Sequence, residues 1–386
     1  MTADLTSALQ AAGLCPPDYG GLCLDGVLSA AAAALGVHVP GGDAARVRLG
    51  VPSAERICVV LVDGLGQLML TERAGHAPFL RGLLRTGQVL TVGYPSTTAA
   101  SLGLFGTGRA AGRTGLAGYT VRNPATGGLA NLVSWTGAGP TEEWQREPSI
   151  FGLMARAGAR VTSVGPAKFA GSGLTAAALS GGEYLAADEL DARVDLTVGR
   201  LARPGLVYLY WGAVDKIGHL DGWQSSAWAD ALAETDRALA RLARSLPTGT
   251  LLMITADHGM VDVDHDELVD VATTPVLAAD VELIAGEPRA THVYLSPGTA
   301  PAALGRWTAT LGDRALVVLR EDAVTAGWFG PVADHVLGLI GDLVVAARGE
   351  AGVVDSRTQT PHSLQLRGMH GSLTPGEMLV PLLVVG

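Results

Sequence analysis

Residues 57–64 read Ile-Cys-Val-Val-Leu-Val-Asp-Gly, six apolar residues followed by an acid and a glycine. Two later runs have a similar arrangement, since Leu206–Tyr210 precedes Asp215 and Leu251–Thr255 precedes Asp257. Short, mostly apolar runs are typical of strands that are buried on both faces of a sheet. In an open α/β sheet, ligands bind beyond the carboxyl ends of the parallel strands. We therefore expect the three acids to meet at one edge of a sheet.

Strand-like and helix-like segments alternate from about residue 57 to residue 262. Such alternation predicts an α/β fold with a doubly wound, mostly parallel sheet that is flanked by helices. Two further strands are expected at Arg160–Val164 and, close to the end, Met378–Val385. The expected helices are Pro78–Thr86, Phe151–Ala157, Ala186–Leu201 and Ser226–Leu246.

The chain of 386 residues is longer than one ordinary hydrophobic core supports. The acid-terminated pattern stops between residues 268 and 357, where two strand-like runs, Thr291–Leu295 and Leu316–Leu319, flank the helix-like Ala302–Leu311. We therefore expect a smaller inserted α+β lobe at residues 268–357. Residues 1–267 and 358–386 would form the catalytic core.

The composition limits the partners of this protein. A net charge of −10 argues against binding to extended nucleic acid, which needs many lysines and arginines. A small phosphorylated substrate stays compatible with this charge, because bound metal ions reverse the local field. No apolar stretch has the length of a membrane span, and residues 1–17 do not read as a secretory signal, so we expect a cytoplasmic protein. The oligomeric state is not readable from the sequence.

Two of the three acids are accompanied by histidines. Asp215 stands four residues before His219, which is the same face of a helix, and Asp257 is followed directly by His258. Carboxylate and imidazole groups at this density suit divalent metal ions, and two such groups suggest two metals. The pair of Asp215 and His219 alone is as compatible with a surface hydrogen bond as with a metal site, and the Asp257-His258 motif is the stronger signal.

Residues 95–101 read Pro-Ser-Thr-Thr-Ala-Ala-Ser and lead into an apolar, helix-like run. The unpaired N–H groups and the dipole at a helix amino end favour an anion or an ionised hydroxyl. The alternative is a simple helix cap. A threonine here becomes a nucleophile only if its pKa is lowered, which a nearby metal would do.

The ordered motifs, including Thr255–Met260 and a late Met369–Ser372, resemble the alkaline phosphatase superfamily and most closely its nucleotide pyrophosphatase/phosphodiesterase branch. The resemblance extends from Cys58 to Pro381. It implies an alkaline phosphatase-like fold and a two-metal hydrolase that cleaves phosphodiester or pyrophosphate bonds.

The resemblance also implies a role for individual residues. One metal would be held by Asp215, His219 and His370, and the second by Asp63, Thr98, Asp257 and His258. Thr98 would be the nucleophile that forms a phosphothreonine-type intermediate. Ser101 would contact the substrate, although the branch usually has an asparagine at this position, three residues after its threonine, where it hydrogen-bonds a phosphoryl oxygen. With three histidines among seven ligands, Zn²⁺ is the expected metal and Mn²⁺ the second choice.

Two departures from the family pattern affect substrate preference. Ala99 stands where the branch carries an aromatic residue that helps to hold a nucleobase, which leaves nucleotide preference open. Tyr210 stands where alkaline phosphatases carry a glutamate for a third metal, which favours diesters. The alternatives are a phosphonoacetate hydrolase-like or phosphomonoesterase activity and, from another class, a non-catalytic metal- or phosphate-binding protein.

Several other residues have open roles. His292 could face the active-site cleft from the inserted lobe. The aromatic side chains of Tyr119, Trp135 and Trp144 could line a pocket, although packing is an equally good explanation for each.

Overall fold

The computed structural model describes residues 2–386 and contains a central seven-stranded sheet in the order β2-β17-β8-β1-β7-β5-β6. Strands β1, β5, β6, β7 and β8 are parallel, and β17 pairs antiparallel with both β8 and β2. The mostly parallel sheet predicted from the sequence is therefore confirmed. The strands are β1 Arg56–Val62, β2 Gln88–Thr91, β5 Val161–Gly165, β6 Glu183–Ala186, β7 Gly205–Trp211, β8 Thr250–Thr255 and β17 Leu379–Val385.

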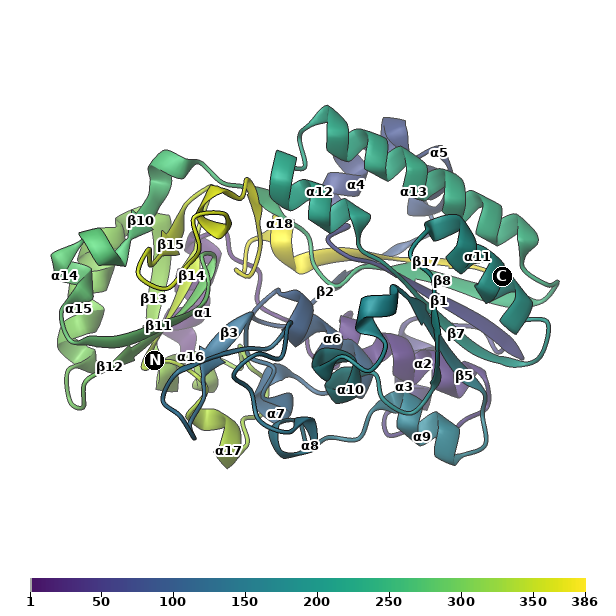
Figure 1. Ribbon diagram of the computed structural model, residues 1–386, viewed down its shortest axis with the longest axis horizontal. Coiled ribbons are helices and arrows are strands. Elements are labelled where there is room, and N and C mark those ends of the chain that lie inside the picture. The colour runs from purple at the N-terminus through teal and green to yellow at the C-terminus, as the bar shows by residue number, and fades with distance from the viewer. Residues whose placement is uncertain (1) are drawn as a thin grey trace.

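Helices cover both faces of this sheet, as a doubly wound fold requires (Figure 1). One face carries α4 Gln67–Glu72, α5 Pro78–Leu84, α11 Leu190–Arg200, α12 Ala213–Asp221 and α13 Ser226–Ser245. The other face carries α2 Val27–Ala34, α3 Gly42–Arg48, α6 Thr98–Thr107, α9 Ile150–Arg156 and α10 Gly173–Ala178. The predicted helix at 186–201 begins only at Leu190, and its first predicted residue, Ala186, is the last residue of the edge strand β6.

The register of the central strands brings their carboxyl ends together. Val62 of β1 lies opposite Trp211 of β7, and Leu61 lies opposite Thr255 of β8. The chain segments that leave these three strands therefore begin side by side. All of β1 except Arg56 is buried, which agrees with its apolar sequence.

A second, antiparallel sheet lies to one side of the first (Figure 1) and has the strand order β11-β12-β14-β13. Its strands are β11 Val281–Glu287, β12 Ala290–Leu295, β13 Ala315–Leu319 and β14 Leu343–Ala347, and the helices beside it are α14 Pro275–Ala278 and α15 Ala300–Leu311. A separate apolar cluster around the buried Trp307 fills this region. Leu343 and Val345 of β14 belong to that cluster, whereas Val344 and Ala346 pack in the main core. The limits of the lobe at residues 268 and 357 stay a prediction.

The remaining helices and strands complete the chain. They are α1 Thr2–Ala11, α7 Ala111–Thr114, α8 Thr141–Trp144, α16 Arg320–Thr325, α17 Asp334–Leu337, α18 Pro375–Met378, β3 Thr120–Arg122, β4 Leu129–Asn131, β9 Val261–Asp262, β10 Leu268–Asp270, β15 Gly352–Val354 and β16 Gly368–Met369. Within residues 2–386, no helix combines the length and the apolar character that a membrane crossing requires.

Candidate active site

A buried cluster of Asp63, Asp257 and His258 lies at the carboxyl ends of β1 and β8. His258 Nε2 is 3.4 Å from Asp63 Oδ1 and 3.6 Å from Asp257 Oδ2. The side chains of His258 and Asp257 are fully buried, and that of Asp63 is 4% exposed. Three potential metal ligands therefore converge on one point at the sheet edge.

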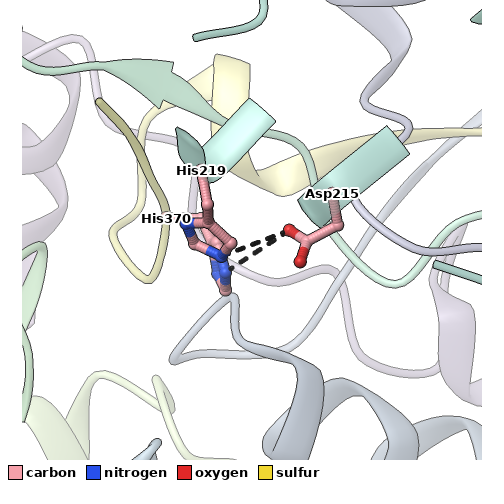
Figure 2. A group of neighbouring side chains, drawn as sticks. All are labelled: Asp215, His219 and His370. Atoms are coloured by element: carbon pink, nitrogen blue, oxygen red, sulfur yellow. Dashed lines mark ion pairs between the residues drawn. The ribbon is translucent and has the colours of Figure 1, made fainter. Parts of the chain in front are cut away.

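A second cluster, formed by Asp215, His219 and His370, lies beside the first and is more open. Asp215 and His219 come from the same face of α12, and His370 comes from the segment after β16 (Figure 2). Asp215 Oδ1 is 3.4 Å from His219 Nε2 and 3.9 Å from His370 Nε2. The rings of His258 and His370 stack with their centroids 3.6 Å apart, which joins the two clusters.

The three histidines are oriented by backbone carbonyl groups. His219 Nδ1 lies 2.7 Å from the Gly368 oxygen, His258 Nδ1 lies 3.0 Å from that of Gly259, and His370 Nδ1 lies 2.9 Å from that of Ser96. Because a carbonyl oxygen only accepts hydrogen bonds, each Nδ1 must carry the proton. Each Nε2 therefore presents a lone pair to its cluster, as a metal ligand does.

The carboxylate atoms fit the same interpretation. Asp63 Oδ1, Asp215 Oδ1 and Asp257 Oδ2 are buried and lack a hydrogen-bond donor among the described residues. These are the atoms that face the Nε2 lone pairs. Two ligands that each lie 2.0–2.1 Å from a tetrahedral zinc ion are about 3.3 Å apart, close to the shorter distances here. The residues present therefore fit a pair of divalent metal ions.

Burial sets the protonation behaviour of both clusters. It raises the pKa of Asp63 well above its usual value, and the neighbouring carboxylates of Asp257 and Asp215 raise it further. Burial likewise raises the pKa of Asp215 and of Asp257. The pKa of His258 is lowered by burial, and that of His370 is lowered well below its usual value. Neutral imidazoles beside crowded carboxylates favour the binding of a cation.

Thr98 is the first residue of α6, and its Oγ1 lies 3.2 Å from His258 Nε2. The helix cap is Thr97, whose Oγ1 accepts the Ala100 N–H at 3.5 Å. The hydroxyl of Thr98 is thus not used as the cap and faces the buried cluster. The first N–H groups of a helix have no intrahelical acceptor, so α6 directs such donors toward the same region.

Two supporting residues could not be recognised in the sequence. The Tyr210 hydroxyl donates a short hydrogen bond to Asp63 Oδ2. Ser96 donates through its N–H to the Gly371 oxygen and through Oγ to the Ser372 oxygen, at 2.9 and 2.7 Å. Ser96 thereby joins the segment before Thr98 to the segment after His370. Both contacts depend on long-range folding, and no local sequence signal announces them.

Glycines allow the segments of the site to approach closely. A Cβ on Gly64, which has a φ of 72°, would lie 2.9 Å from Asp215 Cα. A Cβ on Gly259 would lie 2.0 Å from the Gly376 oxygen. The φ of Gly259 is not positive, and the close packing is what excludes a side chain there.

Two cavities meet at Thr98. The core-side cavity has a volume of about 500 Å³ and is lined by Thr98, Asp63, Asp215 and aromatic side chains such as Phe169. The lobe-side cavity has a volume of about 540 Å³ and is lined by Thr98, Asp215, His370 and residues of β11. Both cavities therefore border the hydroxyl of Thr98 and the second cluster.

Four of the residues singled out in the sequence lie away from these cavities. Ser101 is fully buried in α6 and lines neither cavity, so its position gives no support to a contact with substrate. His292 is buried, with Nε2 donating to the Ala117 oxygen, and does not line the cleft. Trp135 and Trp144 pack against each other, whereas Tyr119 lines the lobe-side cavity.

Comparisons with known proteins agree with this architecture. No curated protein sequence matches the chain. Among solved structures, murine ectonucleotide pyrophosphatase/phosphodiesterase 5, an inactive threonine-to-alanine variant in complex with AMP, superposes with a TM-score of 0.68 at 16% identity, covering 86% of this chain and 88% of that one. Phosphonoacetate hydrolase from Sinorhizobium meliloti 1021 in complex with phosphonoformate superposes with a TM-score of 0.66 at 21% identity, covering 86% and 90%.

The sequence model of the family "Type I phosphodiesterase / nucleotide pyrophosphatase" matches residues 57–373. That range contains Thr98 and every residue of the two clusters. The chain therefore belongs to the type I phosphodiesterase/nucleotide pyrophosphatase family.

Proposed function

We propose that this protein is a metal-dependent hydrolase that cleaves phosphodiester or pyrophosphate bonds, with Thr98 as the nucleophile. The observation that carries the proposal is the position of the Thr98 hydroxyl, at the amino end of α6, 3.2 Å from His258 Nε2 and at the junction of two cavities. A diester has two arms on one phosphorus. The two cavities offer one space for each arm.

The metal ions would be held by the ligand sets Asp215, His219, His370 and Asp63, Thr98, Asp257, His258, with Zn²⁺ preferred over Mn²⁺ because of the histidines. When bound, they supply positive charge that stabilises the phosphoryl oxygens and lowers the pKa of the threonine hydroxyl. Asp63 is held for this task by Tyr210, and His370 is held by Ser96.

Thr98 performs the covalent step. Its Oγ forms a bond to phosphorus while the bond to the leaving oxygen breaks on the opposite side, and a phosphothreonine ester results. The free N–H groups at the amino end of α6 face the phosphoryl oxygens and stabilise their charge. Water then cleaves the ester from the side that the leaving group has vacated. The inactivity of the threonine-to-alanine variant of the murine structural neighbour supports the role given to Thr98.

Diesters are the preferred substrates in this proposal. Tyr210 takes the position of a third-metal glutamate, so a third metal has no ligand there. Arg193 is the one arginine among the described residues that line the two cavities, and its nitrogens donate to the carbonyl oxygens of Ala187, Asp188 and Tyr210. A dianionic monoester would therefore lack a guanidinium partner.

A screen of the metal-reconstituted enzyme tests the proposal. It compares kcat/KM for bis(4-nitrophenyl) phosphate, 4-nitrophenyl phosphate, a dinucleoside pyrophosphate and phosphonoacetate, with Thr98→Ala as the inactive control. We expect the diester or the pyrophosphate to be cleaved faster than the monoester. A clear preference for the monoester, or release of phosphate from phosphonoacetate alone, would contradict it. The phosphonoacetate arm is included because of the structural similarity to phosphonoacetate hydrolase.

A further inference from the structure

The chain contains only two lysines, Lys168 and Lys216, among its 27 lysines and arginines. Both line the core-side cavity. They reach it from separate elements, because Lys168 follows β5 and Lys216 lies in α12, directly after Asp215. A chain that uses arginine for nearly all of its cations thus places both of its lysines in a cavity that Thr98 also lines.

From this placement we propose that the core-side cavity binds an anionic group on one arm of the substrate, a carboxylate or a second phosphoryl group, and that Lys168 and Lys216 recognise it. This inference rests on the proposed function, because it assigns a substrate class to the same site. An ammonium group is a compact charge with three donors, which suits either anion.

Both ammonium groups are available for a ligand. Within residues 2–386, neither lysine has an ion-pair partner, and both side chains are exposed. Lys168 Nζ lies 4.9 Å from the centroid of the Phe169 ring, a contact that leaves its N–H donors free. In contrast, Arg193 in the same cavity is 4% exposed, and its donors are used by the backbone.

The carboxylates that line the core-side cavity do not pair with the two lysines. Asp63 and Asp215 belong to the two clusters. Asp188 is exposed, and its Oδ1 accepts the Ala167 N–H at 3.3 Å. None of these carboxylates lies within ion-pair distance of either lysine, so the ammonium charges stay uncompensated.

The charged side chains differ between the two cavities, and this difference would orient the substrate. The described residues that line it include neither lysine nor arginine, and its carboxylates are those of Asp215 and Glu287. An anionic arm therefore finds no basic side chain in the lobe-side cavity, whereas both lysines attract it to the core-side cavity. The substrate would bind in one orientation, with an uncharged arm toward the lobe.

Binding to metal-loaded Thr98→Ala protein tests this inference without turnover. The probes are three 4-nitrophenyl phosphodiesters whose second arm is a three-carbon chain that ends in a carboxylate, a phosphate or an uncharged carboxamide. Each is titrated against four backgrounds: no further change, Lys168→Gln with Lys216→Gln, Lys168→Arg with Lys216→Arg, and Arg85→Gln with Arg203→Gln. The last pair removes two positive charges at exposed sites outside both cavities.

We expect at least one anionic probe to bind about tenfold more tightly than the carboxamide, because charge-assisted hydrogen bonds replace neutral ones. Lys168→Gln with Lys216→Gln should remove this advantage, while Lys168→Arg with Lys216→Arg and the control pair Arg85→Gln with Arg203→Gln should keep most of it. The anion with the larger advantage identifies the natural group. Equal affinity for the three probes, or an advantage that survives the glutamine pair, would overturn the inference. Hydrolysis of the carboxamide probe by the wild-type enzyme is measured separately, and its absence would count against the proposed function instead.

Discussion

Asp257 is a single residue on which both metal binding and turnover should depend. Its Oδ2 is buried, faces His258 Nε2 at 3.6 Å and has no hydrogen-bond donor among the described residues. We predict that Asp257→Ala removes the metal of its own cluster, so that metal content falls by up to about half while turnover falls by more than about 100-fold, because a ligand is lost outright. Metal analysis and diester hydrolysis measure the two effects. The control is His362→Ala at an exposed histidine outside the clusters, and retention of full metal content by Asp257→Ala would refute the assignment.

Tyr210 offers a milder test at the same scale. Its hydroxyl donates to Asp63, so Tyr210→Phe should weaken metal binding by about 10- to 100-fold, as is typical when an outer partner of a ligand is removed. Tyr208→Phe is a matched control on the same strand, because the buried Tyr208 hydroxyl has no partner in the described structure. Competition with a metal indicator dye gives the affinities. Equal affinities for the two variants would show that the Tyr210 contact is unimportant.

The strand ends singled out the three acids and the two histidines beside them, whereas His370 and the division into two ligand sets were implied only by the family resemblance. Tyr210 was noticed only as a replacement for a glutamate, and its hydrogen bond to Asp63 joins residues 147 positions apart. The role of Ser96 was likewise not predicted from the sequence, because its contacts are with His370 and the segment that follows it. Long-range partners of this kind have no local pattern that could predict them.

At the scale of elements, β12 carries a buried histidine with a structural role. His292 Nε2 donates to the Ala117 oxygen at 2.8 Å, and Nδ1 accepts the Gly341 N–H at 3.2 Å. Burial lowers the pKa of His292 to about 4. A folded-state pKa below the unfolded value of about 6.5 contributes stability above pH 6.5, and this contribution is lost as the pH falls toward 4.

We therefore predict that lowering the pH from 7 to 4.5 costs the wild-type protein about 2–3 kcal/mol of unfolding free energy through this histidine alone. Urea unfolding of wild type and His292→Gln at both pH values measures the contribution as the difference between the two pH effects. His38→Gln, at an exposed histidine, should behave like wild type. The same pH effect in wild type and His292→Gln would contradict the assignment.

The central strands were predictable because a continuous apolar run in the sequence is enough to indicate a buried strand. The apolar runs of β1, β7 and β8 are buried on both faces, and these strands formed within one residue of the expected limits. The edge strand β6 was missed because its residues are partly exposed and lack an apolar pattern. The strand β14 was also missed, although it is fully buried, because its two faces pack in different clusters and only the tertiary structure separates them.

At the scale of the whole molecule, one buried ion pair connects the antiparallel sheet to the segment that carries His370. Arg289, between β11 and β12, donates to both carboxylate oxygens of Glu377 in α18, at 3.1 and 2.8 Å, and both side chains are fully buried. Glu377 also accepts the Ser372 N–H at 3.0 Å. The pair thereby fixes the position of the lobe strands relative to the second cluster.

Glu377→Ala should therefore destabilise the protein by about 3–5 kcal/mol, because Arg289 is left buried without its partner. Glu183→Ala, which breaks the exposed pair with Arg200, should cost no more than about 1 kcal/mol. Denaturant unfolding of the metal-free proteins measures both changes. Comparable losses of unfolding free energy in the two variants would show that the buried pair stabilises the protein no more than the exposed pair does.

The central claim, that Thr98 is a covalent nucleophile, is tested most directly by trapping the intermediate. The metal-loaded enzyme is quenched with acid during turnover of a diester, digested and examined by mass spectrometry. We predict a phosphate or phosphate ester on the peptide that contains Thr98, with the label at Thr98, no label and no turnover in Thr98→Ala, and residual activity in Thr98→Ser. A label at Thr97, or normal turnover by Thr98→Ala without any label, would contradict the account.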